Sequence, residues 1–323
     1  MNKLPGLRFT KPGFLTLLQD GGRQGVMHMG LAAGGAMDRH AWAWANHLLG
    51  NRYGAAGLEI TFGGIEFVCD LDTQIALTGA EARLTVNGEP RPLWATVTVR
   101  AGDTIALSPP TSGVRNYLAV LGGFVADAGP GDSCATIVRE GTGGLHRNGQ
   151  AVAQNDVMPC RPGLRFVPNR KIPDVWIPDY RADLYLQVIP CAQIDRFGAE
   201  ALNTFFSNPY TLTPQADRMG ARLRGPALNV SGKSLLSEGT SLGAIQVPTD
   251  GQPIILLNDR QTIGGYPKLG AVTPRSLDAL AQRTPGSRLH FQPVPLHAAQ
   301  LQERHFLMFF RASTTDLPNR RYL

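Results

Sequence analysis

The sequence predicts a mostly β protein with a few helices, organised in about two domains. Three observations support this fold class. The chain has 323 residues, about twice the length of a typical domain. It contains 37 Gly and 24 Pro residues, which indicate many turns. Long helical patterns are few, whereas short apolar runs bounded by Gly, Asn and Asp recur along the chain.

The first half begins with a predicted strand and a predicted helix. Residues 13–18 form an apolar run that ends in a polar loop. Asp38 stands where a helix N-cap is expected, before a helical pattern over 41–49 that stops at a glycine. Asn87-Gly88 is typical of a tight turn between two strands. Further strands are predicted at 58–62, 65–68, 74–78, 82–86, 96–99, 104–107 and 115–120.

The second half repeats this style after a proline-rich linker, which we place at 162–179. Strands are predicted at 184–189, 210–213, 220–224, 243–247, 252–257, 269–273 and 288–292, and helices at 193–206, 276–283 and 297–312. The last helix is amphipathic and is expected to pack on the second domain or on a partner. Because Ala101–Leu107 and Pro285–Phe291 occupy matching late positions in the two halves, we expect two related β-barrels.

Composition argues against several classes of protein. The net charge of +6 is scattered, and no basic run contains aromatic residues, so nucleic-acid binding is not expected. The four cysteines lie far apart and form no C-x-x-C pair, so we expect neither a metal site nor a disulfide framework. No apolar run is long enough for a signal-peptide core or a membrane span. The expected location is therefore the cytoplasm.

Residues 243–267 give the strongest indication of a binding site. A short apolar run at 254–257 is preceded by Gln252 and followed by Asn-Asp-Arg-Gln at 258–261. A core strand does not need amide and carboxylate groups at both ends, and the Gly-Gly pair at 264–265 lets the backbone approach another group closely. Neutral donors and acceptors around one carboxylate suit a urea-like or lactam-like group better than a metal or a phosphate. A purely structural origin is the alternative.

Other polar residues are candidates on weaker grounds. Gln19, Asp20 and Arg23 follow a predicted strand within five residues, and a turn with a surface ion pair is the alternative. Glu59 lies between apolar neighbours in a predicted strand, so its side chain is expected to face away from them, toward a cavity or solvent. Residues 210–220 place an amide, an acid and a base close together, with a solvated turn as the alternative.

Seven short motifs follow one another along the chain, within a resemblance that runs from residue 10 to about 292. They are Gln19-Asp-Gly-Gly-Arg23, Gly35-Ala-Met-Asp38, Leu58-Glu-Ile-Thr-Phe-Gly-Gly64, Tyr117-Leu-Ala-Val-Leu-Gly-Gly123, Asp217-Arg-Met-Gly220, Leu236-Ser-Glu-Gly239, and Gln252-Pro-Ile with Asp259, Gln261-Thr262 and Gly264-Gly-Tyr-Pro267. Together they resemble the biotin-dependent carboxyltransferase family. That family includes allophanate hydrolase subunit 2-like proteins, the carboxyltransferase part of urea amidolyase and urea carboxylase, KipA-like proteins and the C subunit of bacterial 5-oxoprolinase. Any one motif alone would be a weak signal.

The resemblance implies two tandem cyclophilin-like β-barrel domains, which we place at residues 1–170 and 171–323. It leaves three functions open. The preferred hypothesis is the C subunit of a 5-oxoprolinase complex, which opens 5-oxoproline to glutamate in an ATP-dependent reaction with the A and B subunits, because stand-alone chains of this length resemble the C subunit most closely. One alternative is a biotin-dependent carboxyltransferase subunit that acts on a urea-like or amide-like substrate. The other is a non-catalytic KipA-like regulator that binds a KipI-like partner.

The resemblance also implies partners and cofactors. The partners are a B-subunit-like (KipI-like) protein and a LamB/YcsF-like A subunit, together with a small-molecule substrate; no membrane or nucleic acid is expected. No cofactor is expected to be bound covalently. ATP is implied for the complex, and the carboxyltransferase alternative implies carboxybiotin on a separate carrier, because the chain lacks a Met-Lys-Met attachment sequence. The chain departs from the family in one loop, Gly131-Asp-Ser-Cys-Ala-Thr-Ile137, where the family shows Gly-Ser-x-Ser-Thr-Asp.

The expected site combines charged residues with neutral hydrogen-bonding groups from both halves, converging on one cleft. Catalytic roles are assigned to Asp259, Arg218, Asp20 and Arg23, with Asp259 as general base or substrate-orienting acid. The assigned substrate-binding residues are Gln19, Asp38, Glu59, Gln215, Gln246, Gln252, Gln261, Thr262, Gly264, Gly265 and Tyr266. Arg23 or Arg218 would hold a carboxylate, and the glutamine amides at 246, 252 and 261 would hold a carbonyl oxygen. If Asp259 is exposed in the cleft, its loss should reduce activity without reducing stability.

Overall fold

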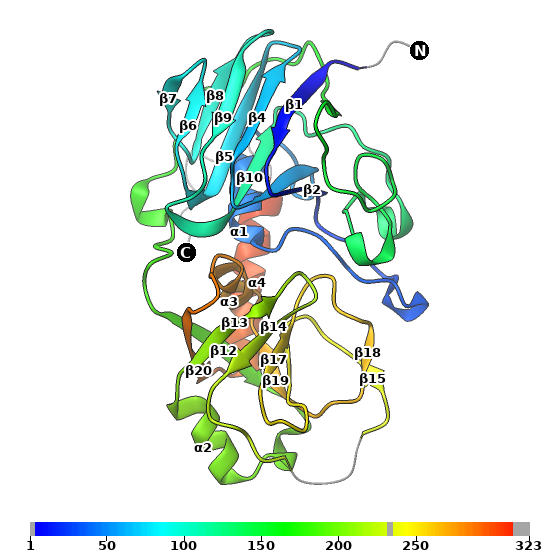
Figure 1. Cartoon of the computed structure of the whole chain (residues 1–323), viewed down its shortest axis with the longest axis vertical. Helices are drawn as coiled ribbons and strands as arrows, with labels where there is room; N and C mark the ends of the chain where they lie inside the picture. The colour runs from blue at the N-terminus through cyan, green and yellow to red at the C-terminus, as the bar shows by residue number, and fades with distance from the viewer. Residues whose placement is uncertain (1–3, 231–234, 313–323) are drawn as a thin grey trace. The chain divides into compact units, whose positions relative to one another are not determined.

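The computed structural model describes residues 4–230 and 235–312, which divide into two compact units (Figure 1). The first unit comprises Met1–Gln24, Gly34–Arg181 and Met308–Leu323, and the second comprises Gly25–Ala33 and Ala182–Leu307. Both units are built mainly from strands, so the predicted mostly β class is confirmed. The domain division placed at residue 170 stays a prediction.

The first unit contains two antiparallel sheets around one hydrophobic core. The six-stranded sheet has the order β11 (Val157–Pro159), β1 (Gly6–Pro12), β4 (Ile65–Cys69), β9 (Thr104–Leu107), β6 (Leu84–Val86) and β7 (Glu89–Arg91). The five-stranded sheet has the order β2 (Leu15–Gln19), β3 (Gly57–Thr61), β10 (Ser112–Val120), β5 (Thr73–Glu81) and β8 (Ala95–Val99). Because strand side chains alternate between faces, each sheet presents one row of apolar residues to the core, such as Phe67 in β4 and Leu118 in β10.

Helix α1 (Arg39–Leu48) packs on the five-stranded sheet and is almost entirely buried. The predicted N-cap is confirmed, because the Asp38 carboxylate accepts a hydrogen bond from the Ala41 N–H at 2.9 Å. The predicted Asn-Gly turn is also confirmed. Asn87 and Gly88 have positive φ values of 52° and 84°, the backbone that a two-residue turn between β6 and β7 requires.

The second unit contains a closed seven-stranded barrel. Its order is β12 (Leu184–Pro190), β19 (Lys268–Val272), β16 (Ala244–Gln246), β17 (Ile254–Leu256), β14 (Gly220–Arg224), β13 (Tyr210–Ala216) and β20 (Arg288–Pro293). The barrel closes through β12 and β20, which pair in parallel, whereas its other pairs are antiparallel. A two-stranded sheet joins β15 (Glu238–Gly239) to β18 (Ile263–Gly264). The barrel interior is filled by apolar residues that include Leu186, Ile245, Ile255 and Leu289.

The other helices are α2 (Ala199–Ser207), α3 (Pro274–Leu280) and α4 (Leu296–Arg311). Short 3-10 helices are η1 (Met27–Met29), η2 (Pro130–Asp132), η3 (Val138–Glu140), η4 (Asp174–Trp176) and η5 (Ile194–Arg196). The last helix packs on the second unit as predicted only in part. Phe306 is buried with the guanidinium of Arg275 at 5.2 Å from its ring centre, whereas Phe309 and Phe310, which belong to the first unit, pack on Trp44 of α1. None of the helices in the described ranges combines the length and the apolar character that crossing a membrane requires.

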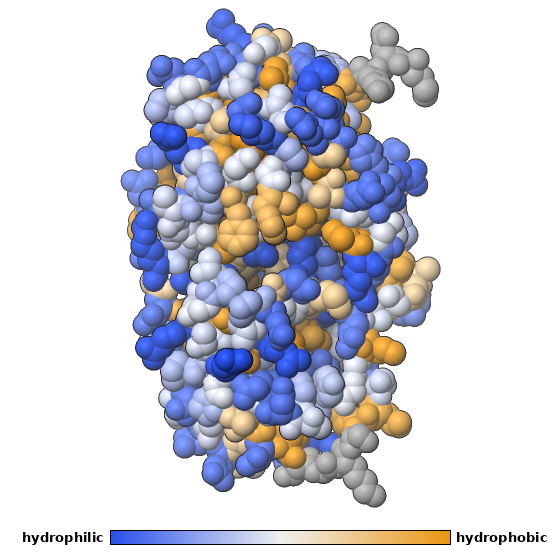
Figure 2. Space-filling view, viewed as in Figure 1, coloured by the Kyte–Doolittle hydropathy of each residue, from blue (hydrophilic) through white to orange (hydrophobic). Residues whose placement is uncertain are grey.

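Some elements differ from the predicted ones for identifiable reasons. The helix predicted at 193–206 is interrupted because Gly198 adopts extended backbone (φ −59°, ψ 162°), so α2 begins only at Ala199. Strand β7 was not predicted, because its three residues are all exposed and include a proline. Figure 2 shows apolar residues on one face scattered in small groups among polar ones, as is usual for a protein surface.

Candidate functional site

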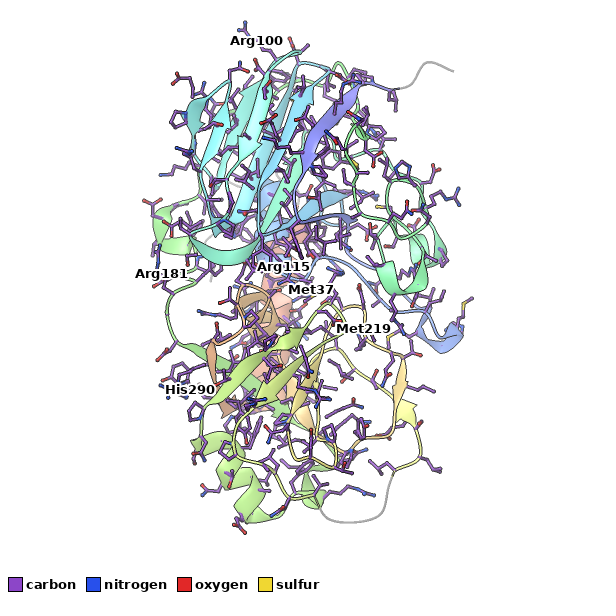
Figure 3. The ribbon with its side chains drawn as sticks, viewed as in Figure 1. Met37, Arg100, Arg115, Arg181, Met219 and His290 are labelled. Carbon is purple, nitrogen blue, oxygen red and sulfur yellow. The ribbon has the colours of Figure 1, made fainter. Side chains whose placement is uncertain are left out.

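Two of the predicted site segments lie side by side in the barrel of the second unit. Strand β14 pairs antiparallel with β17. Past the end of this ladder, the N–H of Leu257 donates to the carbonyl of Met219 at 2.9 Å, and the N–H of Asp259 donates to the carbonyl of Arg218 at 2.8 Å. Met219 marks this turn in Figure 3. Main-chain hydrogen bonds therefore hold the turn after β13 against the polar loop after β17.

Arg218 and Asp259 form a buried bidentate ion pair. The Nε of Arg218 lies 2.9 Å from one carboxylate oxygen of Asp259, and Nη2 lies 3.0 Å from the other. Arg218 is 8% exposed and Asp259 is 3% exposed, so the condition under which loss of Asp259 would leave stability unchanged is not met. Both oxygens already accept charge-assisted hydrogen bonds, which orient the carboxylate rigidly. This geometry favours an orienting role for Asp259; its role as a general base stays a prediction.

The next residue, Arg260, is a buried cation with a different environment. It is 4% exposed, and its guanidinium donates to the carbonyls of Thr240 and Leu257, both at 3.4 Å, and to the sulfur of Met27 at 3.3 Å. No carboxylate of residues 4–230 or 235–312 lies within 4.0 Å of it. Burial lowers the pKa of this guanidinium from its usual value. Because a buried charge is costly unless it is paired, Arg260 is a candidate to receive negative charge from a ligand.

Two glutamine amides lie close to Gly264, in the loop that follows Arg260. Gln246, at the end of β16, is 2% exposed, and its Nε2 has no acceptor in the part of the chain that the structure describes. A Cβ atom built on Gly264 would lie 2.6 Å from this nitrogen and 3.3 Å from Nε2 of Gln261. The glycine therefore leaves the small space that brings the two amides close together.

Thr240 connects these groups. Its N–H donates to the carbonyl of Thr262 at 2.9 Å, its hydroxyl donates to the carbonyl of Gln261 at 2.5 Å, and its own carbonyl accepts from Arg260. We call the set of Thr240, Gln246, Arg260, Gln261 and Gly264 the Thr240 cluster. It combines a guanidinium with two amide N–H groups, donors that suit a carboxylate or a carbonyl oxygen.

Gln252 lies apart from this cluster. It precedes β17, whereas Asp259 follows it. Gln252 bonds Gly225 and Asp259 bonds Arg218, which lie beyond opposite ends of the neighbouring strand β14. Both ends of the Gln252 amide bond the backbone of Gly225, at 2.9 Å and 3.1 Å. The expected convergence of Gln252 with Asp259 is therefore wrong. Gln252 instead fixes the end of β14.

The remaining predicted residues of the second unit lie on the surface or along the loop. Gln215 is exposed near the end of β13, and no hydrogen bond of its side chain joins it to the Thr240 cluster in the described ranges. Tyr266 is exposed next to Gly265, and Thr262 is partly buried beside Gln261. Substrate-binding roles for these residues stay predictions.

In the first unit, Asp20 and Arg23 bind the loop that follows β10. The Asp20 carboxylate accepts hydrogen bonds from the hydroxyl of Ser133 at 2.7 Å and the N–H of Cys134 at 2.8 Å. Arg23 pairs with Glu140 at 2.6 Å. Both are buried, so the surface-turn alternative is wrong. Their expected convergence with Asp259, which belongs to the other unit, stays a prediction.

Gln19 is fully buried and holds the same loop. Its Nε2 donates to the carbonyl of Thr136 at 2.9 Å, and its Oε1 has no hydrogen-bond donor within the described ranges. Together with Asp20 and Arg23 it ties the end of β2 to residues 133–142, which include most of the loop where the sequence departs from the family pattern.

Glu59 faces a buried network, so the expected cavity or solvent exposure is wrong. One of its oxygens accepts from the N–H of Met37 and from the hydroxyl of Tyr117, both at 2.8 Å. The Nε of Arg115 lies 3.7 Å from the other oxygen, and Figure 3 labels Met37 and Arg115. The Tyr117 hydroxyl also accepts from the N–H of Asp38 at 2.8 Å. Burial and the neighbouring Glu59 raise the pKa of Tyr117 well above its usual value. This network anchors the start of α1 to the sheet.

Comparison with known proteins decides the family. The family model described as "Carboxyltransferase domain, subdomain A and B" matches residues 29–293. The chain belongs to the carboxyltransferase family. The resemblance drawn from the seven motifs is thereby confirmed.

Two curated relatives in this family are named as the C subunit of 5-oxoprolinase. The one from Escherichia coli (strain K12) is 35% identical over 313 residues, covering 93% of this chain and 96% of the relative. The one from Haemophilus influenzae is 32% identical over 296 residues, covering 89% and 91%. Among solved structures, the urea amidolyase of K. lactis matches with a TM-score of 0.86 and 25% identity. That match covers 96% of this chain but spans only 20% of the urea amidolyase.

Sequence reasoning overlooked two members of the Thr240 cluster. Arg260 lies inside the strongest motif of this carboxyltransferase-family chain, but its neighbours Asp259 and Gln261 were selected instead. Thr240 lies directly after the Leu236–Gly239 motif and carried no signal of its own. A signal for Arg260 was available in the sequence. The candidate residues there include one carboxylate, Asp259, and two arginines, Arg218 and Arg260, so one arginine has no carboxylate to pair with.

The thiols of this family member are poorly suited to nucleophilic chemistry. Burial raises the pKa of Cys69 and of Cys160 to about 12, and it also raises the pKa of Cys134. The thiolate, which is the reactive form, is therefore disfavoured. No group of three or more His, Cys, Asp or Glu residues in the described ranges is placed to hold a metal ion. That the protein needs no metal stays a prediction.

Proposed function

We propose that the chain is the C subunit of a 5-oxoprolinase, which opens 5-oxoproline to glutamate in an ATP-dependent reaction together with the A and B subunits. One observation carries this proposal. The two relatives named as 5-oxoprolinase C subunits match over 96% and 91% of their own lengths, whereas the urea amidolyase matches over 20% of its chain. The identity to the two C subunits, 35% and 32%, is also higher than the 25% identity to the urea amidolyase.

The Thr240 cluster supports the proposal chemically. 5-Oxoproline carries a carboxylate and a lactam carbonyl. The unpaired guanidinium of Arg260 suits the carboxylate, and Nε2 of Gln246 suits the lactam oxygen. Donors already held in position stabilise negative charge as it develops on a carbonyl oxygen when the amide is attacked. Arg218 and Arg23, which were expected to hold the carboxylate, already pair with Asp259 and Glu140.

A second candidate function is carboxyl transfer to a urea-like or amide-like substrate. The fold match to urea amidolyase favours it, since nearly the whole chain takes part in that match. Carboxybiotin on a separate carrier would supply an activated carboxyl group. Its ureido oxygen and carboxylate would use the same donors, Gln246 and Arg260. The donors of the Thr240 cluster suit both substrates. Identities of 35% and 32% to the 5-oxoprolinase C subunits, against 25% to the urea amidolyase, favour 5-oxoproline.

Reconstitution distinguishes the candidates. We expect co-expression with the A and B subunits to give a stable hetero-oligomer on size-exclusion chromatography and ATP-dependent release of glutamate from 5-oxoproline. Omission of this chain should abolish that activity. Carboxylation that requires bicarbonate and a biotinylated carrier, without turnover of 5-oxoproline, would establish the alternative. Binding to a B-subunit-like partner without turnover of either substrate would support the KipA-like regulator.

Substitution of Arg260 tests the assignment of the site. Arg260→Met removes the cation and keeps an apolar side chain of similar length, so the reconstituted activity should fall by roughly 10²-fold or more, the range for losing one transition-state donor. The matched control is Arg222→Met in the same barrel, because Arg222 forms an exposed pair with Asp250. The control should stay within about twofold of wild type, as expected for a surface ion pair. Equal activities of the two variants would exclude Arg260 from the site.

A further inference from the structure

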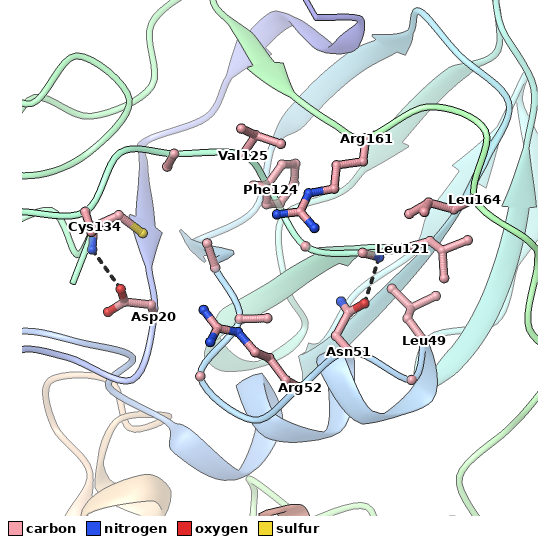
Figure 4. A pocket seen from close by; sticks show the side chains of 18 of the residues that line it. Asp20, Leu49, Asn51, Arg52, Leu121, Phe124, Val125, Cys134, Arg161 and Leu164 are labelled. Carbon is pink, nitrogen blue, oxygen red and sulfur yellow. Dashed lines mark hydrogen bonds between the residues drawn. The ribbon is translucent and has the colours of Figure 1, made fainter. Parts of the chain in front are cut away.

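A cavity of about 670 Å³ lies within the first unit, whereas the Thr240 cluster belongs to the second unit. This volume is in the range of small-molecule binding sites. Most of its wall comes from three segments: residues 49–56 after α1, residues 121–128 after β10, and residues 161–167 after β11 (Figure 4). Asp20, Asp132 and Cys134 complete the lining. The family assignment and the proposed function give this cavity no role.

Three arginines line the cavity without any carboxylate partner. The side chains of Arg52, Arg161 and Arg165 make no hydrogen bond or ion pair within residues 4–230 and 235–312. In Figure 4, Arg52 and Arg161 reach into the cavity from opposite walls. Of the two acids in the lining, Asp20 is occupied by Ser133 and Cys134. The cavity therefore holds more positive than negative charge.

The rest of the wall is apolar and firmly held. Leu49, Leu121, Phe124 and Leu164 supply apolar surface. The loop between them is fixed by Asn51, whose Oδ1 accepts from the N–H of Gly122 at 2.8 Å and whose Nδ2 donates to the carbonyl of Val120 at 2.9 Å. Gly122 has φ +80°, and a Cβ there would lie 2.4 Å from Leu164. The cavity is thus pre-formed, with a cationic rim and an apolar wall.

We propose that this cavity binds a small phosphorylated molecule, with its phosphate oxygens on Arg52, Arg161 and Arg165 and its carbon portion against Phe124 and Leu164. The planar fork of a guanidinium matches phosphate oxygens in bidentate geometry. Three guanidinium groups exceed what one carboxylate needs and suit a dianionic or more highly charged group. The apolar wall gives room for a ring or a carbon chain beside the charge.

Calorimetric titration of the full chain with pyrophosphate and with ATP tests the proposal. We expect saturable binding of at least one of these probes and binding of succinate at least 10-fold weaker. Arg161→Gln and Arg52→Gln should each weaken binding by roughly 10-fold, as expected for loss of a charge-assisted hydrogen bond. The matched control is Arg83→Gln, an exposed arginine of the same unit outside the cavity, which should bind within about twofold of wild type.

A second variant guards against effects on folding. Leu164 is 39% exposed, so Leu164→Glu should fold normally while it places a negative charge in the cavity. It should abolish binding of the phosphate probes and leave the melting temperature of the unliganded chain unchanged. No binding of either probe at millimolar concentration would overturn the proposal. So would binding that the cavity variants leave intact, or succinate binding as tight as that of pyrophosphate.

Discussion

The buried charges of the two units are compensated to different degrees. In the first unit, Arg23 pairs with Glu140, and the carboxylate of Glu59 lies in a network with Tyr117 and Arg115. In the second unit, Arg218 and Asp259 are paired in the same way. The neighbouring Arg260 is equally buried but contacts only neutral acceptors. The comparison shows that most charged residues predicted for the site hold loops in place. Arg260, which was not predicted, has no carboxylate partner in the described ranges and is available to bind a ligand.

His47 shows how the first unit avoids a buried positive charge without a carboxylate, which is the state of Arg260 in the second unit. It is buried in α1, and its imidazole can give up its proton, so it remains neutral in the folded state at ordinary pH. A guanidinium cannot do this in a protein. A buried arginine without a carboxylate therefore costs stability unless a ligand compensates it. This cost is what we expect of a binding group rather than of a structural one.

The largest loss of stability should come from breaking the buried ion pair between Arg218 and Asp259. Asp259→Asn leaves the Arg218 guanidinium buried without a counter-charge, so the free energy of unfolding should fall by about 3–5 kcal/mol. Urea denaturation measures it. The control is Asp250→Asn, which breaks an exposed pair and should cost at most about 1 kcal/mol. If the two variants are equally stable, the buried pair is not structural and Asp259 returns as a candidate general base.

A somewhat smaller loss of unfolding free energy should appear as the pH is lowered. Burial, and then the charge of Arg170, lower the pKa of His47 from 6.5 to about 4. The unfolded chain therefore binds a proton that the folded chain excludes, so this contribution is fully present above pH 6.5 and is lost as the pH falls toward 4. At about 1.4 kcal/mol per pKa unit, the total loss is roughly 3 kcal/mol.

The measurement is the pH dependence of the unfolding free energy between pH 7 and 4. His47→Gln should have a shallower slope over this range than wild type. His305→Gln, which changes an exposed histidine of α4, should keep the wild-type slope. Identical slopes for wild type and His47→Gln would mean that His47 does not remain neutral, and the contrast with Arg260 would lose its support.

Much of the fold could be predicted because the burial pattern of most strands is local. The β14 strand was predicted with its observed bounds, and Asp38 caps α1 as expected. The exception at β3 is instructive. Alternation placed Glu59 on a polar face, but both faces of β3 are buried, one by the core and one by α1 and its anchoring network. Nothing in five residues of sequence shows that a second layer covers the outer face.

The polar loop of the site could be predicted, but its internal pairing could not. The carboxylate of Asp259 meets Arg218, 41 residues earlier, only because β14 and β17 are neighbours in the barrel. Once that partner is known, Arg260 remains as a buried cation that no carboxylate of the described residues contacts. The separation of Gln252 from Asp259, in contrast, could have been predicted from the sequence, because an extended strand keeps the residues before and after it apart.

A smaller effect should follow from filling the space between the two amides. Gly264→Ala places a Cβ 2.6 Å from Nε2 of the buried Gln246, so the amide must shift. The activity of the assembled complex should fall by roughly 10-fold or more, because displacement of a positioning group by a fraction of an ångström is costly. Gly239→Ala in the paired strand β15 meets nothing within 4 Å and should retain activity. Equal loss in both variants would indicate damage to the β15–β18 sheet rather than to the site.

The most direct test of the account compares the unfolding free energies of Arg218→Met and Arg260→Met by urea denaturation. The central claim is that the first arginine is compensated by the protein and the second is not. Arg218→Met should therefore lose about 3–5 kcal/mol, because Asp259 is left buried and unpaired. Arg260→Met should be as stable as wild type or more stable, since it removes a buried charge that no carboxylate compensates. A loss for Arg260→Met as large as that for Arg218→Met would contradict the claim and make Arg260 a structural residue.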